Sequence, residues 1–354
     1  MSVWRGLRSD FTVAARRLVQ ARGFSVVCVA TLALGIGGNT AVFTLIDRVL
    51  LKPLPVQRPS ELHRLGDGED CCVNSGLQGS FSLFSYDLYT HLRDAAPQFN
   101  HLAAFQANTR AVTLGRANDD MPPETLNAAY VSGNYFQLFE LVPAAGRLIQ
   151  PPDDQRGAAP VAVISYRAWT ERFMARTEAV GTVVTLNGVT ATLVGVAPQG
   201  FHGDTLRPNP PEIWIPLSNE PLLQPAARLL DAKSQHWLYA IGRLKPGTAI
   251  PPIEAQLTAA LRQWIDSTMD LSPKEREEIP RQHINVIAAA GGISNMRNEV
   301  APSLRLLQTL AMAVLLIACA NLASLLLARG SADRNGGPRR SWRLPRQARG
   351  AVPR

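Results

Sequence analysis

The side chains that could carry out chemistry are spread along this sequence without a catalytic pattern. Its six histidines stand singly, and each is expected to be a surface or hydrogen-bonded core residue rather than a metal ligand. The sequence contains no Gly-x-x-x-x-Gly-Lys-Ser/Thr phosphate loop, no His-Glu-x-x-His zinc motif and no Gly-x-Ser-x-Gly nucleophile turn. We therefore expect no catalytic residue, no metal and no bound cofactor, and we do not expect an enzyme.

Three acidic stretches could bind a cation or form turns. Residues 67–70 read Asp-Gly-Glu-Asp, like the start of a calcium loop, but the twelfth position of such a loop needs a bidentate acid and is Gln78 here. The acidic pairs at 119–120 and 153–154 lie among Pro, Gly and Asn residues and are typical of turns. We expect a solvated loop at residues 67–70 and turns at the two acidic pairs.

The four cysteines divide between two kinds of environment. Cys71 and Cys72 are adjacent in the hydrophilic middle of the chain, and could form a strained vicinal disulfide, pair with another chain or stay reduced. Cys28 and Cys319 lie in apolar segments and are expected to pack as small apolar residues. There is no Cys-x-x-Cys pair, so a thioredoxin-like activity is not expected.

Positive charge is concentrated at the two ends of the chain. The net charge is +8, of which residues 1–22 carry +4 and residues 329–354 carry +7, while the middle carries −3. Each basic tail adjoins a long apolar segment. Because Lys and Arg are enriched on the cytoplasmic side of membrane proteins, this pattern predicts two cytoplasmic termini. No groove-reading motif or basic-aromatic interleaving is present, so we expect no nucleic-acid partner.

Two apolar segments are long enough to cross a membrane. Residues 23–46 form a charge-free run of 24 residues, and residues 306–328 form one of 23. As helices they would each span more than the roughly 30 Å of a hydrocarbon core. A cleaved signal peptide is the alternative for the first segment, but its apolar run and its preceding tail are both long for one. We expect transmembrane helices at residues 23–51 and 303–328.

Small and polar residues interrupt both predicted membrane helices. Gly35, Gly37, Gly38 and Asn39 lie in the outer half of the first, and Asn321 lies in the second. Small residues let helices approach closely, and Asn can hydrogen-bond across a helix pair. These five residues are therefore candidates for packing against other membrane helices, although lipid-facing helices also tolerate small residues.

The intervening segment, residues 52–302, is typical of a folded extracytoplasmic domain. Asn187-Gly188 between alternating residues predicts a β-hairpin, and Leu257 and Leu261 recur at helical spacing. The mixture of strands and helices, without an internal repeat, predicts an α+β domain of one or two lobes. The expected helices are residues 84–94, 166–175 and 253–269, and the expected strands are residues 161–164, 182–196 (as a hairpin), 213–215, 237–244 and 283–288.

Three blocks of sequence stand out in order along the chain. They are residues 32–43 (LALGIGGNTAVF) running on to 50–55 (LLKPLP), residues 131–136 (VSGNYF) followed by 146–147 (GR) and 160–165 (PVAVIS), and residues 321–329 (NLASLLLAR). Together they resemble the MacB/FtsX-like family of ABC-transporter permeases, in particular the long, ATPase-less permeases of acidobacterial type. The resemblance covers most of residues 5–332.

This resemblance implies a MacB-like periplasmic core domain inserted between two transmembrane helices of the bacterial inner membrane. It implies a permease subunit of an efflux or mechanotransmission system, in which a separate cytoplasmic ATPase uses ATP and the periplasmic domain transmits motion. The expected partners are that ATPase, membrane lipid and a second permease unit in a homo- or heterodimer. Members of the family carry no catalytic residues in the permease, so none is transferred.

The chain departs from the family after the second membrane segment. Family members continue through further membrane helices, whereas residues 329–354 are rich in Arg, Gly and Pro, which predicts a disordered cytoplasmic tail on anionic lipid. With one choice of GC-rich codons read one base later, residues 342–347 encode Gly-Ala-Ser-Arg-Gly-Arg, a segment typical of the family at this place. We therefore expect a truncated or frameshifted permease that folds its periplasmic domain but does not export by itself.

Two other functions remain open from the sequence. The chain could be a membrane-tethered periplasmic binding or sensor module, whose helices only anchor the domain. It could also be an anchored extracytoplasmic enzyme, which the lack of any catalytic constellation disfavours.

Overall fold

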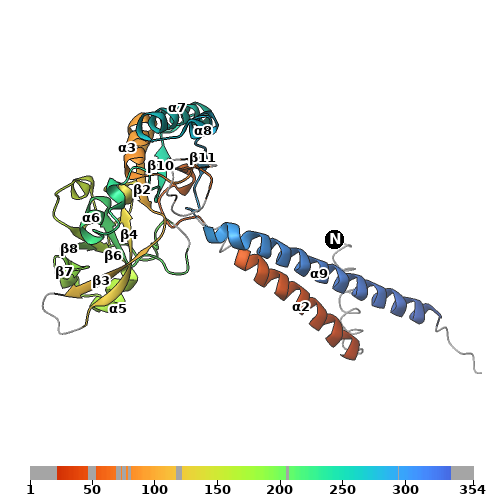
Figure 1. Ribbon diagram of the computed structural model, residues 1–354. Helices are drawn as coiled ribbons and strands as arrows, with labels where there is room; N and C mark the ends of the chain where they lie inside the picture. The colour runs from red at the N-terminus through yellow and green to blue at the C-terminus, as the bar shows by residue number, and fades with distance from the viewer. Residues whose placement is uncertain are drawn as a thin grey trace, which may run out of the picture. The chain divides into compact units, whose positions relative to one another are not determined.

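The computed structural model describes residues 22–46, 53–68, 73, 77–78, 81–116, 122–204, 207–293 and 295–335 (Figure 1). The chain divides into two compact units, Met1–Val49 with Ala301–Arg354, and Leu50–Val300. In the described part of the chain the first unit is helical, and the second contains strands and helices. The expected α+β domain is thus confirmed as a mixed domain of both element types.

Two long helices, α2 (Arg22–Ile46) and α9 (Asn295–Asn335), flank the mixed domain in the sequence. Among the described residues one stretch is long and apolar enough to cross a membrane, Pro302–Ser324 of α9, with a mean hydropathy of 2.1. The apolar part of α2, Val29–Thr44, is shorter. The first of the two expected membrane helices therefore stays a prediction, and residues 47–51 of its expected range lie outside the described residues.

The described strands form one sheet that closes on itself over part of its width. Six of them are β3 (Arg110–Arg116), β4 (Glu124–Val131), β6 (Val161–Ile164), β7 (Val183–Leu186), β8 (Val189–Val196) and β9 (Ile213–Pro216). In the order β4-β3-β7-β8-β6-β9 each strand pairs with the next, and β9 returns to β4 in parallel. We call this closed set the ring.

The remaining strands continue from the ring as an open antiparallel sheet. They are β1 (Leu62–Leu65), β2 (Phe99–Gln106), β10 (Leu238–Leu244) and β11 (Val286–Ala288), in the order β11-β1-β10-β2, while the short β5 (Ala145–Gly146) pairs with β8. Strand β2 meets the ring through one residue pair, Phe105 opposite Val131 of β4. The open sheet and the ring are the two parts of one domain.

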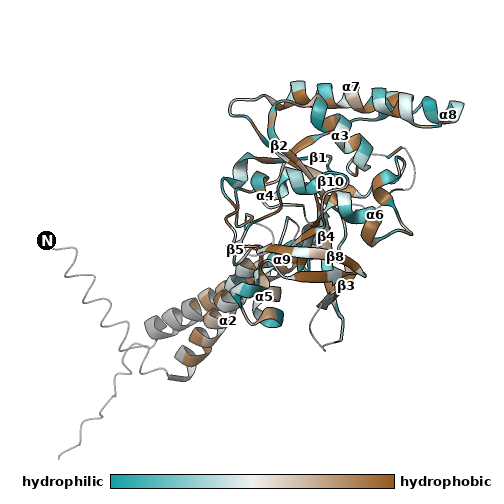
Figure 2. Cartoon of the chain, turned by 90° about the vertical axis from the view of Figure 1, so that its left-hand side faces the viewer, coloured by the Kyte–Doolittle hydropathy of each residue, from teal (hydrophilic) through white to brown (hydrophobic). Residues whose placement is uncertain are grey.

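Two helices pack against each other and against the open sheet, α3 (Tyr86–Ala95) and α7 (Ile250–Thr268). Helix α3 begins at Tyr86 because the Ser85 side chain accepts the Leu88 amide at 3.2 Å, which satisfies a free N–H of the first turn. Helix α7 begins with prolines in its first turn, where a missing N–H costs nothing. Figure 2 shows hydrophobic and hydrophilic residues alternating along α7, as its helical spacing predicts.

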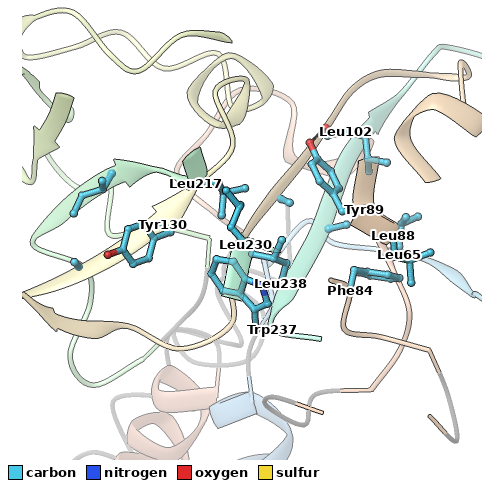
Figure 3. Packing of buried hydrophobic residues seen from close by; sticks show 14 of the residues in the cluster. Leu65, Phe84, Leu88, Tyr89, Leu102, Tyr130, Leu217, Leu230, Trp237 and Leu238 are labelled. Carbon is cyan, nitrogen blue, oxygen red and sulfur yellow. Dashed lines mark hydrogen bonds between the residues drawn. The ribbon is translucent and has the colours of Figure 1, made fainter. Parts of the chain in front are cut away.

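Buried residues form two clusters on opposite faces of the shared strands. On β10, Leu238 and Ala240 belong to one cluster, and Tyr239 and Ile241 belong to the other, because successive strand residues point to opposite faces. The first, which we call the helix-side cluster, includes residues of α3 and α7 and continues through the ring (Figure 3). The second, which we call the aromatic cluster, is built around Phe105, Tyr135, Phe136, Phe139, Phe201 and Trp214.

Short elements connect these parts. The short α-helices are α4 (Tyr135–Leu138), α5 (Tyr166–Phe173), α6 (Glu220–Leu223) and α8 (Pro273–Arg276), and the 3-10 turns are η2 (Pro59–Glu61), η3 (Pro151–Asp154), η4 (Thr177–Ala179), η5 (Leu217–Asn219), η6 (Leu229–Asp231) and η7 (Ile279–Arg281). Helix α4 comes after the ring strand β4 with only a short turn between them, so it is attached to the ring through the chain.

The expected helices and strands are all present, with boundaries that differ by a few residues. The first helix starts later than expected because Phe84 forms a bridge with Leu238 instead. Helix α5 ends at Phe173, before the expected residue 175, because Met174 and Ala175 adopt left-handed φ angles of 54° and 53°. Strands β1 to β5 were not predicted.

Candidate functional site

The two chain segments that join the domain to the long helices lie side by side. Residues 53–61 follow α2 in the sequence, and residues 289–293 precede α9; we call them the N-terminal and C-terminal connectors. The Leu54 amide donates to the Ala290 carbonyl at 2.9 Å, and the connectors continue into the antiparallel pair β1 and β11. The chain therefore enters and leaves the domain at the same place.

A buried arginine holds the N-terminal connector. Arg243 of β10, with its side chain 3% exposed, donates to the carbonyls of Gln57 at 2.8 Å, Arg58 at 2.9 Å and Leu138 at 3.1 Å. Its charge is balanced by the Glu61 carboxylate at 3.0 Å. A buried cation is tolerated only with such partners, so the guanidinium fixes the connector to β10 and to the end of α4.

A buried aspartate, Asp204, holds the C-terminal connector through its backbone carbonyl and is itself fixed through its carboxyl group. The Tyr135 hydroxyl donates to Asp204 Oδ1 at 2.8 Å, and the Asp204 carbonyl accepts the Ile293 amide at 3.0 Å. Gly292 has a φ of +74°, and a Cβ there would lie 2.0 Å from the Asp204 carbonyl oxygen, so the backbones approach as closely as only glycine allows. Burial, followed by the neighbouring Asp204 carboxyl, raises the pKa of Tyr135 well above its usual value, which keeps the hydroxyl a donor.

A half-buried carboxyl group joins the ends of two ring strands. Asp154 of η3 accepts the amides of Gly133 at 2.9 Å and Ser218 at 2.8 Å, which follow β4 and β9. Because β4 and β9 are parallel, their carboxyl ends meet at one edge of the sheet, and Asp154 spans both. Burial raises the pKa of Asp154 to about 6, against the lowering effect of these hydrogen bonds. The sequence predicted only a turn here.

One histidine is fully buried, as a hydrogen-bonded core residue. His236 Nδ1 accepts the Ser85 amide at 3.1 Å, and burial lowers the pKa of His236 to about 4. The imidazole is therefore neutral at physiological pH. Among the described residues, no group of three His, Cys, Asp or Glu side chains is placed to hold a metal ion.

A cleft of about 450 Å³ lies beside helix α5 and is lined partly by Tyr166, Phe201 and Pro211. Clefts of this size with aromatic walls can hold small ligands. Glu212, which also lines it, is already paired with Arg172 at 2.8 Å and accepts the Asn127 amide at 3.1 Å. The carboxylate thus has a structural role in this part of the ring.

The helical unit brings together two of the five predicted packing residues. A Cβ on Gly35 would lie 3.0 Å from Leu315 Cδ1, and Gln308 Nε2 donates to Asn39 Oδ1 at 2.7 Å. The lower-numbered residue of α2 meets the higher-numbered residue of α9, so the two helices are antiparallel. The polar partner Gln308 was missed by the sequence reasoning, although a lone Gln in an apolar segment is the signal that could have found it.

The other predicted residues are not in this contact. A Cβ on Gly37 or Gly38 would meet no described atom within 4 Å, and Asn321 is exposed. Their predicted role in packing against other membrane helices stays a prediction. Cys71 and Cys72 lie outside the described residues.

In the sequence the mixed domain lies between α2 and α9, and both of its chain ends join it through the paired connectors. The family model described as the MacB-like periplasmic core domain matches residues 25–260, and the chain belongs to this family. It consists of periplasmic domains of ABC-type permeases of the inner membrane, which generally work with a cytoplasmic ATPase. The sequence-based family assignment is confirmed.

Solved structures give similar, more distant matches. A domain of a protein described as a permease from Porphyromonas gingivalis is 15% identical, with 69% of this chain and 98% of that chain covered and a TM-score of 0.44. The periplasmic region of MacB from Actinobacillus actinomycetemcomitans is 13% identical, with 65% and 90% covered and a TM-score of 0.44. The extracellular domain of the noncanonic ABC-type transporter YknZ from Gram-positive bacteria is 12% identical, with 64% and 99% covered and a TM-score of 0.41. No curated protein matches the chain.

Proposed function

We propose that this chain is a permease subunit of an ABC-type efflux or mechanotransmission system, which couples a separate cytoplasmic ATPase to its periplasmic domain. The observation that carries the proposal is the pairing of the two connectors, joined by the Leu54–Ala290 hydrogen bond. Because both connectors attach at one place, a change in the spacing of the helices that they lead to acts on the domain at that place. The chain itself performs no catalytic step and binds no cofactor; ATP is used by the ATPase.

In the proposed topology, α2 and α9 both cross the inner membrane, with both termini in the cytoplasm and Leu50–Val300 in the periplasm. The basic residues of 1–22 and 329–354, which flank the two apolar segments, support this orientation. A chain with its four cysteines replaced by Ser, carrying Glu178→Cys or Ser9→Cys, tests it with a membrane-impermeant maleimide. Labelling of the exposed position 178 in intact spheroplasts, and of position 9 only after permeabilisation, is expected. The reverse pattern would overturn the topology.

The coupling itself is tested with the full chain and the ABC ATPases of its own organism. One of these ATPases is expected to co-purify with the chain in detergent, and ATP is expected to change hydrogen exchange in the two connectors. The control is the same ATPase with its Walker-motif lysine replaced, which binds the permease but does not complete its cycle. Failure of every one of these ATPases to associate would contradict the proposal.

The cleft beside α5 favours a second candidate, a membrane-tethered periplasmic binding module. Thr170→Trp would fill that cleft from the exposed side of α5. If the chain acts as a binding module, this variant loses its response to ligand, while association with an ATPase is absent in both forms. A permease would instead keep the ATPase in the variant.

A further inference from the structure

Each connector is linked to the same one-turn helix, α4, through one intermediate residue. At one end of α4, the Leu138 carbonyl accepts from Arg243, which holds the N-terminal connector. At the other end, the Tyr135 hydroxyl donates to Asp204, which holds the C-terminal connector. We propose that α4 is a mechanical junction that links the two connectors to each other and to strand β4, so that displacement of one reaches the other and the ring. The inference rests on the proposed function only in assigning the displacement to the membrane helices.

The junction is firmly attached to the strands behind it. The Tyr135 amide donates to the Ser132 carbonyl at 2.9 Å, and Ser132 exchanges backbone and side-chain hydrogen bonds with Ala104 of β2 at 2.8 and 3.0 Å. The Asn134 side chain donates to the Leu102 carbonyl at 2.9 Å. Helix α4 is therefore fixed both to β4, through the chain, and to β2, through hydrogen bonds.

Aromatic rings surround the junction and exclude water. The Tyr135 ring lies 5.9 Å from Phe105, 5.2 Å from Phe136 and 5.1 Å from Phe139, each in an edge-on arrangement. Such close-packed rings leave little room for Tyr135 to shift alone. Movement of its hydroxyl partner Asp204 is therefore passed to the cluster rather than absorbed by the side chain.

The N-terminal connector has a second contact just beyond α4. Arg58 of the connector pairs with Glu140, the second residue after α4. Both residues have left-handed φ angles, 44° and 53°, which non-glycine residues adopt only where their surroundings hold them. The connector and the end of α4 are thus held in matching, unfavourable backbone conformations.

These polar contacts add a second constraint to the close packing. A buried hydrogen bond depends steeply on the distance and angle between its donor and acceptor. When one partner moves, the other must follow or a buried polar group is left unsatisfied. Polar bonds that run from each connector through Arg243 or Asp204 to one short helix therefore make the positions of the connectors interdependent.

The test is hydrogen exchange on the full chain in lipid nanodiscs, without an ATPase. Tyr135→Phe keeps the ring and removes the bond to Asp204 on the C-terminal side. Exchange is expected to rise about tenfold, or about 1.4 kcal/mol, at Ile293 and also in the N-terminal connector around Glu61. Glu61→Gln weakens the other attachment, and exchange at Ile293 is expected to rise in return.

The matched control is Trp264→Phe, which also removes one hydrogen bond of a buried aromatic side chain, from Trp264 Nε1 to the Asp87 carboxylate at 2.7 Å, between α7 and α3 in the helix-side cluster. It is expected to leave both connectors unchanged. An effect of Tyr135→Phe confined to residues 292–293, or the same connector response in Trp264→Phe, would overturn the junction. A rise in hydrogen exchange that spreads from one connector to the other supports the junction whether or not an ATPase associates with the chain. Association with the ATPase is measured separately.

Discussion

The two buried clusters on opposite faces of the shared strands are held together in different ways. The helix-side cluster is mainly aliphatic and is closed by the amphipathic α7 and by α3. The aromatic cluster is closed by the short α4 and is bordered by buried polar groups, Arg243 and Asp204, that reach the connectors. The helix-side face of the sheet is thus stabilised mainly by the burial of apolar surface, and the face of the aromatic cluster also by directional hydrogen bonds. The comparison separates residues that stabilise the fold from residues that position the connectors.

The largest expected effect comes from Arg243→Met, on the side of the aromatic cluster. The variant removes the buried guanidinium from the Glu61 carboxylate, which keeps only Arg58 as an ion-pair partner, and from the carbonyls of Gln57, Arg58 and Leu138. Removing one partner of a buried ion pair lowers the free energy of unfolding by about 3–5 kcal/mol. Urea unfolding of the full chain in detergent, followed by tryptophan fluorescence, measures it. A loss below about 1 kcal/mol would show that the guanidinium is solvated.

On the helix-side cluster, Leu261→Ala in α7 removes a fully buried side chain. The free energy of unfolding is expected to fall by about 3 kcal/mol, from lost transfer energy and the cavity left behind. The exposed Leu222→Ala is the control and should be nearly neutral. Hydrogen exchange in the connectors should stay unchanged at temperatures where the variant is folded; a rise like that of Tyr135→Phe would mean that the two clusters do not act separately.

The raised pKa of Asp154 predicts that the stability of the fold depends on pH. Its pKa is raised to about 6 in the folded chain, from an ordinary 3.8, so the folded state binds more protons between these values. Stability from this group is therefore greatest below about pH 4 and is lost as the pH rises to about 6, by about 3 kcal/mol. Urea midpoints measured from pH 4 to pH 7 should fall in the native chain. Asp154→Asn should remove this component, and an unchanged slope in the variant would assign it to other groups.

The smallest effect is expected in the helix pair, where Asn39→Leu removes the hydrogen bond from Gln308. Side-chain hydrogen bonds between membrane helices contribute about 0.6 kcal/mol on average, or about a threefold change in helix association. The yield of a disulfide between Gly35→Cys and Leu315→Cys measures it. Asn321→Leu, at an exposed position, is the matched control and should leave the yield unchanged.

The sequence predicted best those elements whose local signals agree with their place in the fold. Asn187 and Gly188 have left-handed φ angles of 47° and 83°, as an Asn-Gly hairpin turn requires. Helix α7 keeps a helical apolar spacing because only one of its faces is buried. By contrast, β2 reads FNHLAAFQ and is buried on both faces, so it shows neither alternation nor a β-branched run.

The candidate site was only partly predictable, for a related reason. Gly35 and Asn39 are unusual within an apolar segment, so the sequence singled them out, and both contact α9. Arg243 and Asp204 are ordinary polar residues in their local sequence, and their burial depends on partners far along the chain, such as Leu138 and Tyr135. No local pattern marks a residue whose importance comes from contacts between distant segments.

The closed ring also sets an order in which the domain can assemble as the chain emerges across the membrane. All six ring strands lie between Arg110 and Pro216, so each has its neighbours available before β10 has appeared. The open sheet instead pairs β1, near the start of the domain, with β10 and β11, near its end. Pairings between such distant segments form late because a long loop must be closed first. The ring can thus be complete on the far side while the connectors are still apart, and the last strand to arrive joins them.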